Sequence, residues 1–163
     1  MRLLLYNIRY AVGGGASMHM PLPGAGYVLG NQSVLPEITR FIKDVDPDIV
    51  GLIEVDTGSI RSRMVNQAEK IATDLQMNTS YETKYGSKSI NQILPIVRKQ
   101  GNAFMAAQRV HGEKFHYFDT GIKRLIIELE MAEFAVFLVH LSLKYRHRHL
   151  QLRRLHDLIE VTE

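Results

Sequence analysis

The chain has 163 residues, of which 45% are hydrophobic and 23% are charged, close to the averages of soluble globular proteins. This composition excludes collagen-like repeats and disorder over the whole chain, and the length suits one domain. The net charge of +3 is compatible with a phosphate-bearing ligand but too small to establish nucleic-acid binding. Because the sequence contains no cysteine, disulfide frameworks, cysteine-based zinc sites and thiol nucleophiles are excluded.

The first half of the chain combines apolar strands with helical patterns. The apolar core within residues 2–10 is too short for a signal peptide, so we expect a first strand and a cytoplasmic protein without a membrane span. Glycine and proline in residues 11–30 predict a long loop. A helix is expected over residues 33–45, with Ser33 as N-cap. A strand over 47–55 and a second helix over 62–77 follow.

The second half has the pattern of successive strands. Short segments rich in aromatic and branched residues predict strands within 79–86, 102–110, 114–120, 123–131 and 134–143. A final helix is expected over 145–163, with five aliphatic side chains as its packing residues: Leu150, Leu152, Leu155, Leu158 and Ile159. No domain boundary is apparent, so residues 1–163 are interpreted as a single α+β domain with a mostly antiparallel sheet.

Three strand-like segments carry a polar residue where the pattern favours an apolar one. These residues are Asn7, Glu54 and His140. Alone, each is more often a solvated or hydrogen-bonded structural group. If the strands lie side by side, the three side chains converge at one sheet edge, where the amide and carboxylate suit a hard cation such as Mg²⁺. A bound cation would then offset the charge of Glu54 at the end of an apolar strand.

Four segments carry a resemblance to a known family. "LLLYNIRY", "DPDIVGLIEVD", "QGNAFMA" and "FLVHLSLKYRHRHLQLRRL" resemble successive blocks of the endonuclease/exonuclease/phosphatase superfamily. That superfamily includes pancreatic-type deoxyribonucleases, abasic-site endonucleases, sphingomyelinases and inositol-polyphosphate phosphatases. The resemblance implies the N-terminal part of a four-layer α/β/β/α sandwich. It also implies a divalent-metal-dependent phosphoester hydrolase that uses Mg²⁺, with Mn²⁺ as an alternative.

The resemblance assigns roles to five residues. Glu54 matches the metal-binding glutamate, and Asn7 matches an asparagine beside the metal and the scissile phosphate. His140 matches a histidine that contacts or polarises the phosphate. Asn102 and Arg124 match substrate-side positions, Asn102 in a supporting role and Arg124 as a phosphate contact. Catalysis is therefore expected to depend on Asn7, Glu54 and His140.

The family's later "GDxN" and "SDH" blocks do not occur in these 163 residues. Their aspartate activates the attacking water, so we expect the chain to be an incomplete fold with little or no turnover by itself. We also expect it to supply mainly one sheet, whose uncovered inner face causes self-association or binds the missing C-terminal half. A non-catalytic binding or assembly module that retains half of the sandwich is the alternative. The substrate class stays open among DNA, RNA, nucleotides, phosphoinositides and phospholipid head groups.

Three further segments have simpler interpretations. The basic run from Lys144 to Arg154 is interpreted as the solvated face of a helix rather than a polyanion site. "DTGS" at residues 56–59 occurs once and is interpreted as a turn after Glu54 rather than a protease motif. Arg9, Met18, His19 and Met20 are expected either to border the active face or to belong to an ordinary surface loop.

Overall fold

The structure is a computed structural model that describes residues 1–12, 33–83 and 99–162. The first sheet has the order β1-β2-β4-β3 and consists of β1 (Leu3–Asn7), β2 (Ile49–Asp56), β3 (Asn78–Thr83) and β4 (Gln100–Ala106). The second sheet has the order β5-β6-β7 and consists of β5 (Gly112–Tyr117), β6 (Leu125–Glu130) and β7 (Ala135–Val139). The helical elements are α2 (Val34–Val45), α3 (Gln67–Leu75), α4 (Tyr145–Thr162) and the short 3₁₀ turns η1 (Arg9–Ala11) and η3 (Ile60–Ser62).

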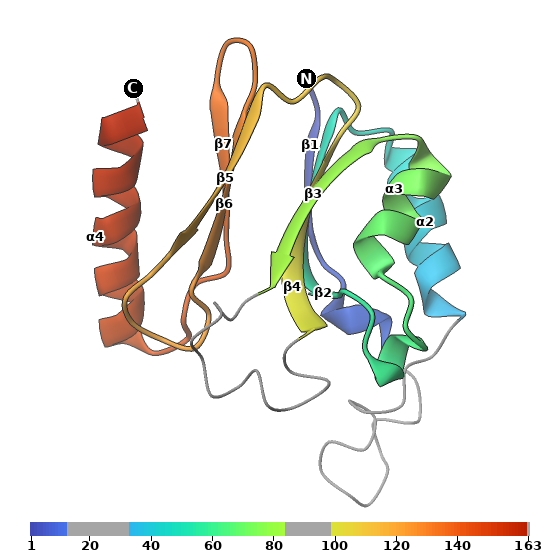
Figure 1. The fold of residues 1–163 in the computed structure, drawn as a ribbon, viewed down its shortest axis with the longest axis horizontal. Helices are drawn as coiled ribbons and strands as arrows, with labels where there is room; N and C mark the ends of the chain where they lie inside the picture. The colour runs from blue at the N-terminus through green and yellow to red at the C-terminus, as the bar shows by residue number, and fades with distance from the viewer. Residues whose placement is uncertain (13–32, 84–98, 163) are drawn as a thin grey trace, which may run out of the picture.

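The elements form four layers, in the order α4, second sheet, first sheet, and the helices α2 and α3 (Figure 1). β1 and β2 pair in parallel, and the other strand pairs are antiparallel. This arrangement confirms the predicted α+β sandwich. The expectation that these residues supply mainly one sheet is wrong, because both sheets are present and pack against each other.

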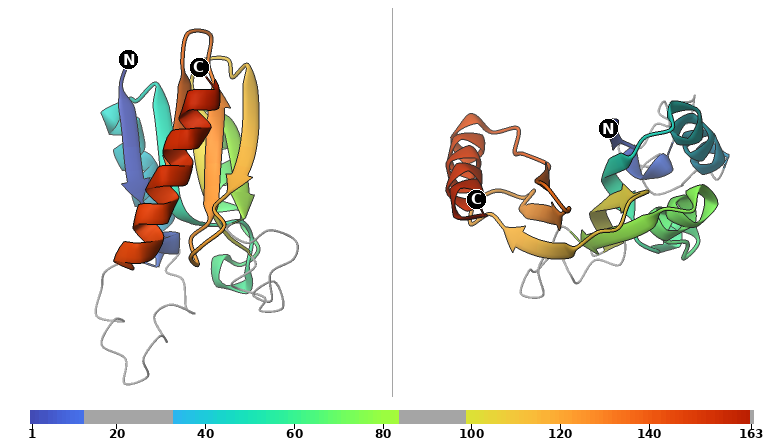
Figure 2. Two further views of the ribbon diagram at one scale, coloured as in Figure 1. Left: turned by 90° about the vertical axis from the view of Figure 1, so that its left-hand side faces the viewer. Right: turned by 90° about the horizontal axis from the view of Figure 1, so that it is seen from above.

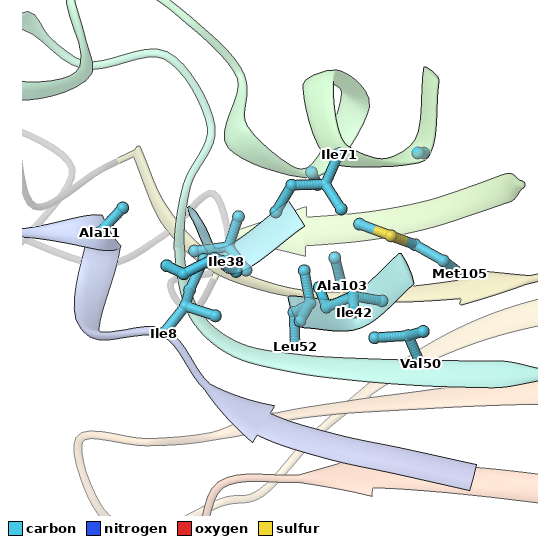
Figure 3. Packing of buried hydrophobic residues seen from close by; sticks show 12 residues of the cluster. Ile8, Ala11, Ile38, Ile42, Val50, Leu52, Ile71, Ala103 and Met105 are labelled. Carbon is cyan, nitrogen blue, oxygen red and sulfur yellow. The ribbon is translucent and has the colours of Figure 1, made fainter. Parts of the chain in front are cut away.

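Two hydrophobic cores share β2. Val50, Leu52 and Val55 face α2 and α3, where they pack with helix residues such as Ile42 and Ile71 (Figure 3). The other face of the strand packs between the sheets, in a cluster that includes Ile49, Ile53, Phe104, Ile127, Leu129 and Leu138. Because both faces of β2 are covered, its sequence is a nearly continuous apolar run rather than an alternating one.

The second helix is shorter than predicted. The sequence pattern indicates a helix from residue 62, but α3 begins at Gln67. The Asn66 side chain caps it by accepting hydrogen bonds from the backbone N–H groups of Ala68 and Glu69, at 3.1 and 3.4 Å. The preceding residues instead form a turn around Asp56, which η3 completes. The side-chain acceptor of Asn66, rather than apolar periodicity, therefore decides where the helix starts.

Asp56 is the centre of this turn. Its carboxylate accepts hydrogen bonds from the backbone N–H groups of Gly58 and Ser59, at 3.0 and 2.7 Å, and forms an ion pair with Arg61 at 2.8 Å. Both charged side chains are 0% exposed. The "DTGS" segment is thus a turn, as predicted, and Arg61 offsets the charge that Asp56 buries at the end of β2.

The contacts of α4 differ from the prediction. Leu150, Leu152 and Ile159 are 45%, 47% and 36% exposed, so the expectation that they are packing residues is wrong, whereas Leu155 and Leu158 are half-buried. Gln151 is the residue that faces inward, with 1% of its surface exposed. Its side chain makes three hydrogen bonds to backbone groups of the preceding segments, and these polar contacts set the orientation of the helix.

A buried carboxylate also lies on the face of the second sheet opposite the inter-sheet core. Glu128 is 1% exposed and lies 2.6 Å from His116 Nε2 and 3.3 Å from Lys114 Nζ. The pKa of the exposed Lys114 ammonium is raised, mostly by its hydrogen bond to Glu130 and to a smaller extent by its hydrogen bond to Glu128. The Lys114 ammonium and the hydrogen bond with His116 explain how a carboxylate is tolerated within an otherwise apolar strand.

Two further predictions concern residues 18–20 and membrane-spanning helices. Met18, His19 and Met20 lie outside the described residues. Among the helices that the structure does describe, none combines the length and the apolar character that crossing a membrane requires.

The buried ion pair of Asp56 and Arg61 gives the first prediction. Arg61→Met removes the cation and leaves a buried carboxylate without its counter-charge, so the free energy of unfolding should fall by about 3–5 kcal/mol. Urea denaturation followed by circular dichroism measures this loss. Lys70→Met, which breaks the exposed pair with Asp74, serves as the control and should cost only about 0.3–0.5 kcal/mol. Equal, small losses in both variants would contradict the interpretation.

Candidate active site

The backbone of β2 is irregular at Glu54. In the pairing of β2 with β4, Ile53 lies opposite Asn102 and Val55 lies opposite Gly101, so Glu54 is an extra residue in the ladder. This β-bulge places Glu54 in the left-handed region, with a φ of 60°. A residue other than glycine in such a conformation costs of order 1–3 kcal/mol, and strain of this kind concentrates at functional sites.

The bulge determines which face of the sheet receives the Glu54 side chain. Ile53 packs between the sheets, whereas Val55 packs in the core beneath the helices. Strict alternation would turn Glu54 into that helix-side core, where an ionised carboxylate would lie among aliphatic side chains. With the extra residue, the carboxylate instead faces the second sheet and meets Lys123 and His140.

The three side chains form a compact polar site between the sheets. Glu54 Oε1 lies 3.8 Å from Lys123 Nζ and 4.0 Å from His140 Nε2, and Lys123 Nζ is hydrogen-bonded to His140 Nε2. The exposed fractions of the side chains are 19% for Glu54, 25% for Lys123 and 16% for His140. The site is therefore partly shielded from water, which strengthens its electrostatic interactions, and still reachable by a ligand.

Two asparagines flank β2 beside this carboxylate. Asn7 at the end of β1 and Asn102 in β4 both lie opposite Ile53, one residue before Glu54. Asn102 is 1% exposed, and its Oδ1 accepts a hydrogen bond of 3.3 Å from the Glu54 backbone N–H. Asn102 therefore supports the bulge. Asn7 is exposed, and its Oδ1 accepts a hydrogen bond of 3.0 Å from the backbone N–H of Arg9.

The chain turns sharply after Asn7. Arg9, Tyr10 and Ala11 have consecutive positive φ values of 47°, 59° and 52°. Tyr10 is 2% exposed, its ring lies 4.1 Å below the Arg61 guanidinium, and its hydroxyl donates a hydrogen bond of 3.1 Å to Gln100 Oε1. These contacts hold the strained turn in place, so the end of β1 is fixed by the same buried arginine that pairs with Asp56.

The cation that meets Glu54 is Lys123, which the sequence analysis missed. Arg124, the predicted phosphate contact, is exposed, and its Nε donates a hydrogen bond to the Phe118 carbonyl. The backbone N–H of Phe118 in turn donates to the Arg124 carbonyl at 2.7 Å, so Arg124 closes the turn between β5 and β6. Both residues are basic and adjacent, and the sequence contains no motif that distinguishes which of them reaches the site.

Gln151 joins the two segments that carry Lys123 and His140. Its Nε2 donates hydrogen bonds to the carbonyls of Thr120 and Lys123, at 2.9 and 2.8 Å. Its Oε1 accepts a hydrogen bond of 2.8 Å from the backbone N–H of Ser142. Gly121 is required beside it, because its φ is +91° and an added Cβ would lie 2.9 Å from Gln151 Nε2. The α4 helix thus sets the distance between the lysine and the histidine.

The oxygen atoms of Glu54 and Asn7 suit a hard cation that takes few ligands from the protein. Within the described part of the chain, no cluster of three or more histidine, cysteine or acidic side chains could enclose a metal ion. Mg²⁺ does not need such a cage, because it retains several water ligands and binds through one or two carboxylates together with substrate phosphates. A partly exposed carboxylate at Glu54, with the amide oxygen of Asn7 on the neighbouring strand, fits that mode of binding.

Comparisons with known proteins identify the fold. No protein-family model and no curated protein matches the sequence. The human Nocturnin catalytic domain with bound sulfate anion is similar in structure, with a TM-score of 0.63 and 16% identity over 99% of this chain and 58% of that chain. An endonuclease/exonuclease/phosphatase from Beutenbergia cavernae gives a TM-score of 0.61 and 21% identity over 96% of this chain and 43% of that chain.

An AP endonuclease from Archaeoglobus fulgidus is a further match, with a TM-score of 0.52 and 19% identity over 81% of this chain and 48% of that chain. The chain thus has the fold of the endonuclease/exonuclease/phosphatase family, as its motifs predicted. It spans 43% to 58% of the lengths of these three structures.

The Gln151 contacts give the second prediction. Gln151→Leu leaves the carbonyls of Thr120 and Lys123 and the N–H of Ser142 without the side-chain partner they have now, so the free energy of unfolding should fall by about 1–3 kcal/mol. Thermal unfolding measured by circular dichroism tests this. Leu152→Gln, at the adjacent exposed position, is the control and should change stability by less than about 0.5 kcal/mol. A Gln151→Leu protein as stable as the control would contradict the assigned role.

Proposed function

We propose that this chain carries the metal-binding half of a divalent-metal-dependent phosphoester hydrolase. The observation that supports the proposal most strongly is the Glu54 bulge, which directs one carboxylate from the first sheet toward an ammonium and an imidazole from the second. A carboxylate suits a hard cation, and the adjacent nitrogen groups suit the oxygens of a phosphoryl group. The fold is one that hydrolases of this kind use, which supports the same conclusion.

Each residue has a role in the proposed site. Glu54 and Asn7 would hold Mg²⁺ or Mn²⁺, and Asn102 holds the bulge through the Glu54 N–H. The bound ion would neutralise negative charge on the phosphoryl oxygens. Lys123 and His140, at 3.8 and 4.0 Å from the Glu54 carboxylate, would face the phosphoryl group, and Arg124 would add positive charge next to Lys123. Partial burial of the site makes these charges more effective than they would be in bulk water.

The proposed substrate is a phosphate ester, and nucleic acid is one candidate class. The similar structures include an AP endonuclease and a Nocturnin domain that holds a sulfate anion, which has the tetrahedral shape and negative charge of phosphate. The net charge of +3 supports an anionic ligand, but it is too small to indicate extended tracking along a nucleic-acid backbone.

The proposed activity gives the third prediction. In the complete reading frame that contains this chain, Glu54→Gln and His140→Ala should each lower kcat/KM for a metal-dependent phosphoester hydrolysis by at least about 100-fold. Bis(p-nitrophenyl) phosphate and p-nitrophenyl phosphate, each with Mg²⁺ or Mn²⁺, separate diesterase from monoesterase activity. The 163-residue chain alone should show little or no turnover.

The matched control for this assay is Glu37→Gln, which removes an exposed carboxylate from α2. It should leave the rate unchanged, and chelation of the divalent ion should abolish the activity of every variant. Hydrolysis that persists in both Glu54→Gln and His140→Ala would contradict the site assignment.

An assembly role is supported by the open side of the sandwich. β1 and β7 are edge strands that lie on the same side of the molecule (Figure 2). An apolar cavity of about 110 Å³ lies between them, lined by residues that include Leu5 and Leu138. Leu3 and Leu5 are 52% and 59% exposed. Within residues 1–12, 33–83 and 99–162, no strand pairs with the outer edges of β1 and β7. Strand edges of this kind beside exposed apolar side chains favour association, and we propose that a second copy of the chain covers them.

The open edge gives the fourth prediction. At micromolar concentration, light scattering after size exclusion should show a dimer or a larger species of the 163-residue chain. Replacing both Leu3 and Leu5 by lysine should shift the chain toward monomer, because charges on an edge strand oppose pairing. Val161→Lys, at a position 86% exposed on α4, is the control and should not change the mass. A monodisperse wild-type monomer would contradict this proposal.

A further inference from the structure

The outer helix α4 carries an exposed stripe of apolar and aromatic side chains. Tyr145, Leu152 and Ile159 follow one another every seven residues and are 73%, 47% and 36% exposed. His149 and His156 lie between them, so the spacing along the stripe alternates between four and three residues. This spacing keeps all five side chains on one side of the helix, and it is the spacing by which two helices pack against each other. The rings of Tyr145 and His149 already stack, with 6.3 Å between their centroids.

A pocket lies at the C-terminal end of this stripe. It has a volume of about 700 Å³, and its lining residues include Phe134, Phe137, Ile159 and Glu133. The turn between β6 and β7 and the C-terminal end of α4 lie at the same end of the molecule (Figure 1). Because Ile159 belongs both to the pocket and to the stripe, the two form one continuous surface. A pocket of this size accommodates an aromatic side chain.

The charges beside the stripe differ in sign between its two ends. Arg146 lies at the N-terminal end of α4, and Glu160 lies two heptads later on the same flank of the helix. Both side chains are exposed, and the exposed Glu133 of the pocket adds a second carboxylate near the C-terminal end. Two α4 helices side by side in parallel would bring like charges together, whereas antiparallel helices would bring opposite charges together.

We propose that α4 forms the interface of a two-fold symmetric dimer, in which the stripes of two copies pack antiparallel about Leu152. Tyr145 and Ile159 each lie seven residues from Leu152, which is about 10 Å along the helix axis. Tyr145 of each copy therefore meets Ile159 and the pocket of the second copy. Arg146 of each copy meets Glu160 of the second copy, so the surface is complementary to itself, as a two-fold interface requires.

This interface is separate from the open edge of β1 and β7. The pocket involves Phe137, on the outer face of the second sheet, whereas Leu138 faces the first sheet and lines the cavity at the open edge. One helix face and one pocket make a small contact, so a dissociation constant of about 10–100 µM is expected. At lower concentration the chain is a monomer with Leu152 exposed, and a substitution at Leu152 then leaves the stability of the monomer unchanged.

Disulfide cross-linking tests the proposal directly, because the sequence contains no cysteine. Leu152→Cys should yield a covalent dimer on oxidation at about 200 µM, since Leu152 lies beside its own copy at the two-fold axis. Leu3→Lys and Leu5→Lys are included in every cross-linking variant, so that the open edge does not contribute. Val161→Cys, 86% exposed and on the opposite side of α4 from Leu152, is the matched control and should stay monomeric.

The orientation of the helices is tested with two more single-cysteine variants. Tyr145→Cys and Ile159→Cys should each cross-link poorly alone, because antiparallel helices keep each position far from its own copy. An equimolar mixture of the two should cross-link, because antiparallel packing places Tyr145 beside Ile159. In a parallel dimer each variant would instead cross-link to itself.

Sedimentation equilibrium measures the strength of the association. Tyr145→Ala and Arg146→Glu should each raise the dissociation constant at least about tenfold, because they remove the pocket anchor and the charge pair. Glu160→Arg added to Arg146→Glu should restore much of the affinity, because the charge pair forms again with its signs exchanged. Arg153 flanks the two-fold axis, so Arg153→Gln removes a like-charge contact and should lower the constant. Leu152→Gln should weaken the dimer without changing the unfolding temperature of the dilute monomer.

Each outcome has a defined meaning. A cross-link in Leu152→Cys but not in Val161→Cys, with restored affinity after the charge exchange, supports the proposal. No cross-link in Leu152→Cys, equal cross-linking in Val161→Cys, or self-cross-linking of Tyr145→Cys would overturn it. A Leu152→Cys cross-link that is absent from a cysteine-free form of the complete reading frame would also overturn it, because a further segment of the same chain then covers this face. These measurements do not depend on hydrolysis, so the proposed function and the dimer can fail separately.

Discussion

The candidate site depends on one irregularity of the backbone, the β-bulge at Glu54. β2 runs between two apolar cores, and a regular strand would turn the Glu54 side chain into the core beneath α2 and α3. The extra residue, held by the Asn102 side chain, turns the carboxylate toward the second sheet instead. The strained backbone conformation of Glu54 thus allows β2 to bury both of its faces and still present the Glu54 carboxylate to a ligand.

The remainder of the structure fixes this carboxylate against its partners. On the first sheet, Asp56 and Arg61 form a fully buried ion pair two residues beyond the bulge, which anchors the end of β2. On the second sheet, Gln151 bonds the segments that carry Lys123 and His140. Buried polar side chains therefore set the geometry on both sides, whereas the apolar cores determine how the two sheets stack.

The sequence predicts most of the individual helices and strands because their signals are local, but it does not predict that both sheets of the sandwich are present. Apolar periodicity identifies α2, α4 and the strands, and the motifs around Glu54 and His140 indicate the family fold. The start of α3 is missed because it depends on the Asn66 cap rather than on periodicity. The inward face of α4 is missed because Gln151, a polar residue, is buried by three long-range hydrogen bonds while the leucines on either side of it stay exposed. Lys123 is missed because neighbouring lysine and arginine residues are equivalent in a sequence pattern and differ only after the turn folds.

The most direct test of the account is a crystal structure of the chain grown with Mn²⁺ and inorganic phosphate, with data collected at the manganese absorption edge. An anomalous peak is expected on the Glu54 carboxylate, with Asn7 among its neighbours and phosphate in contact with Lys123. Glu54 should keep its positive φ, because the bulge exists before the ligand binds. Manganese bound elsewhere while Glu54 stays paired with Lys123 would contradict the central claim.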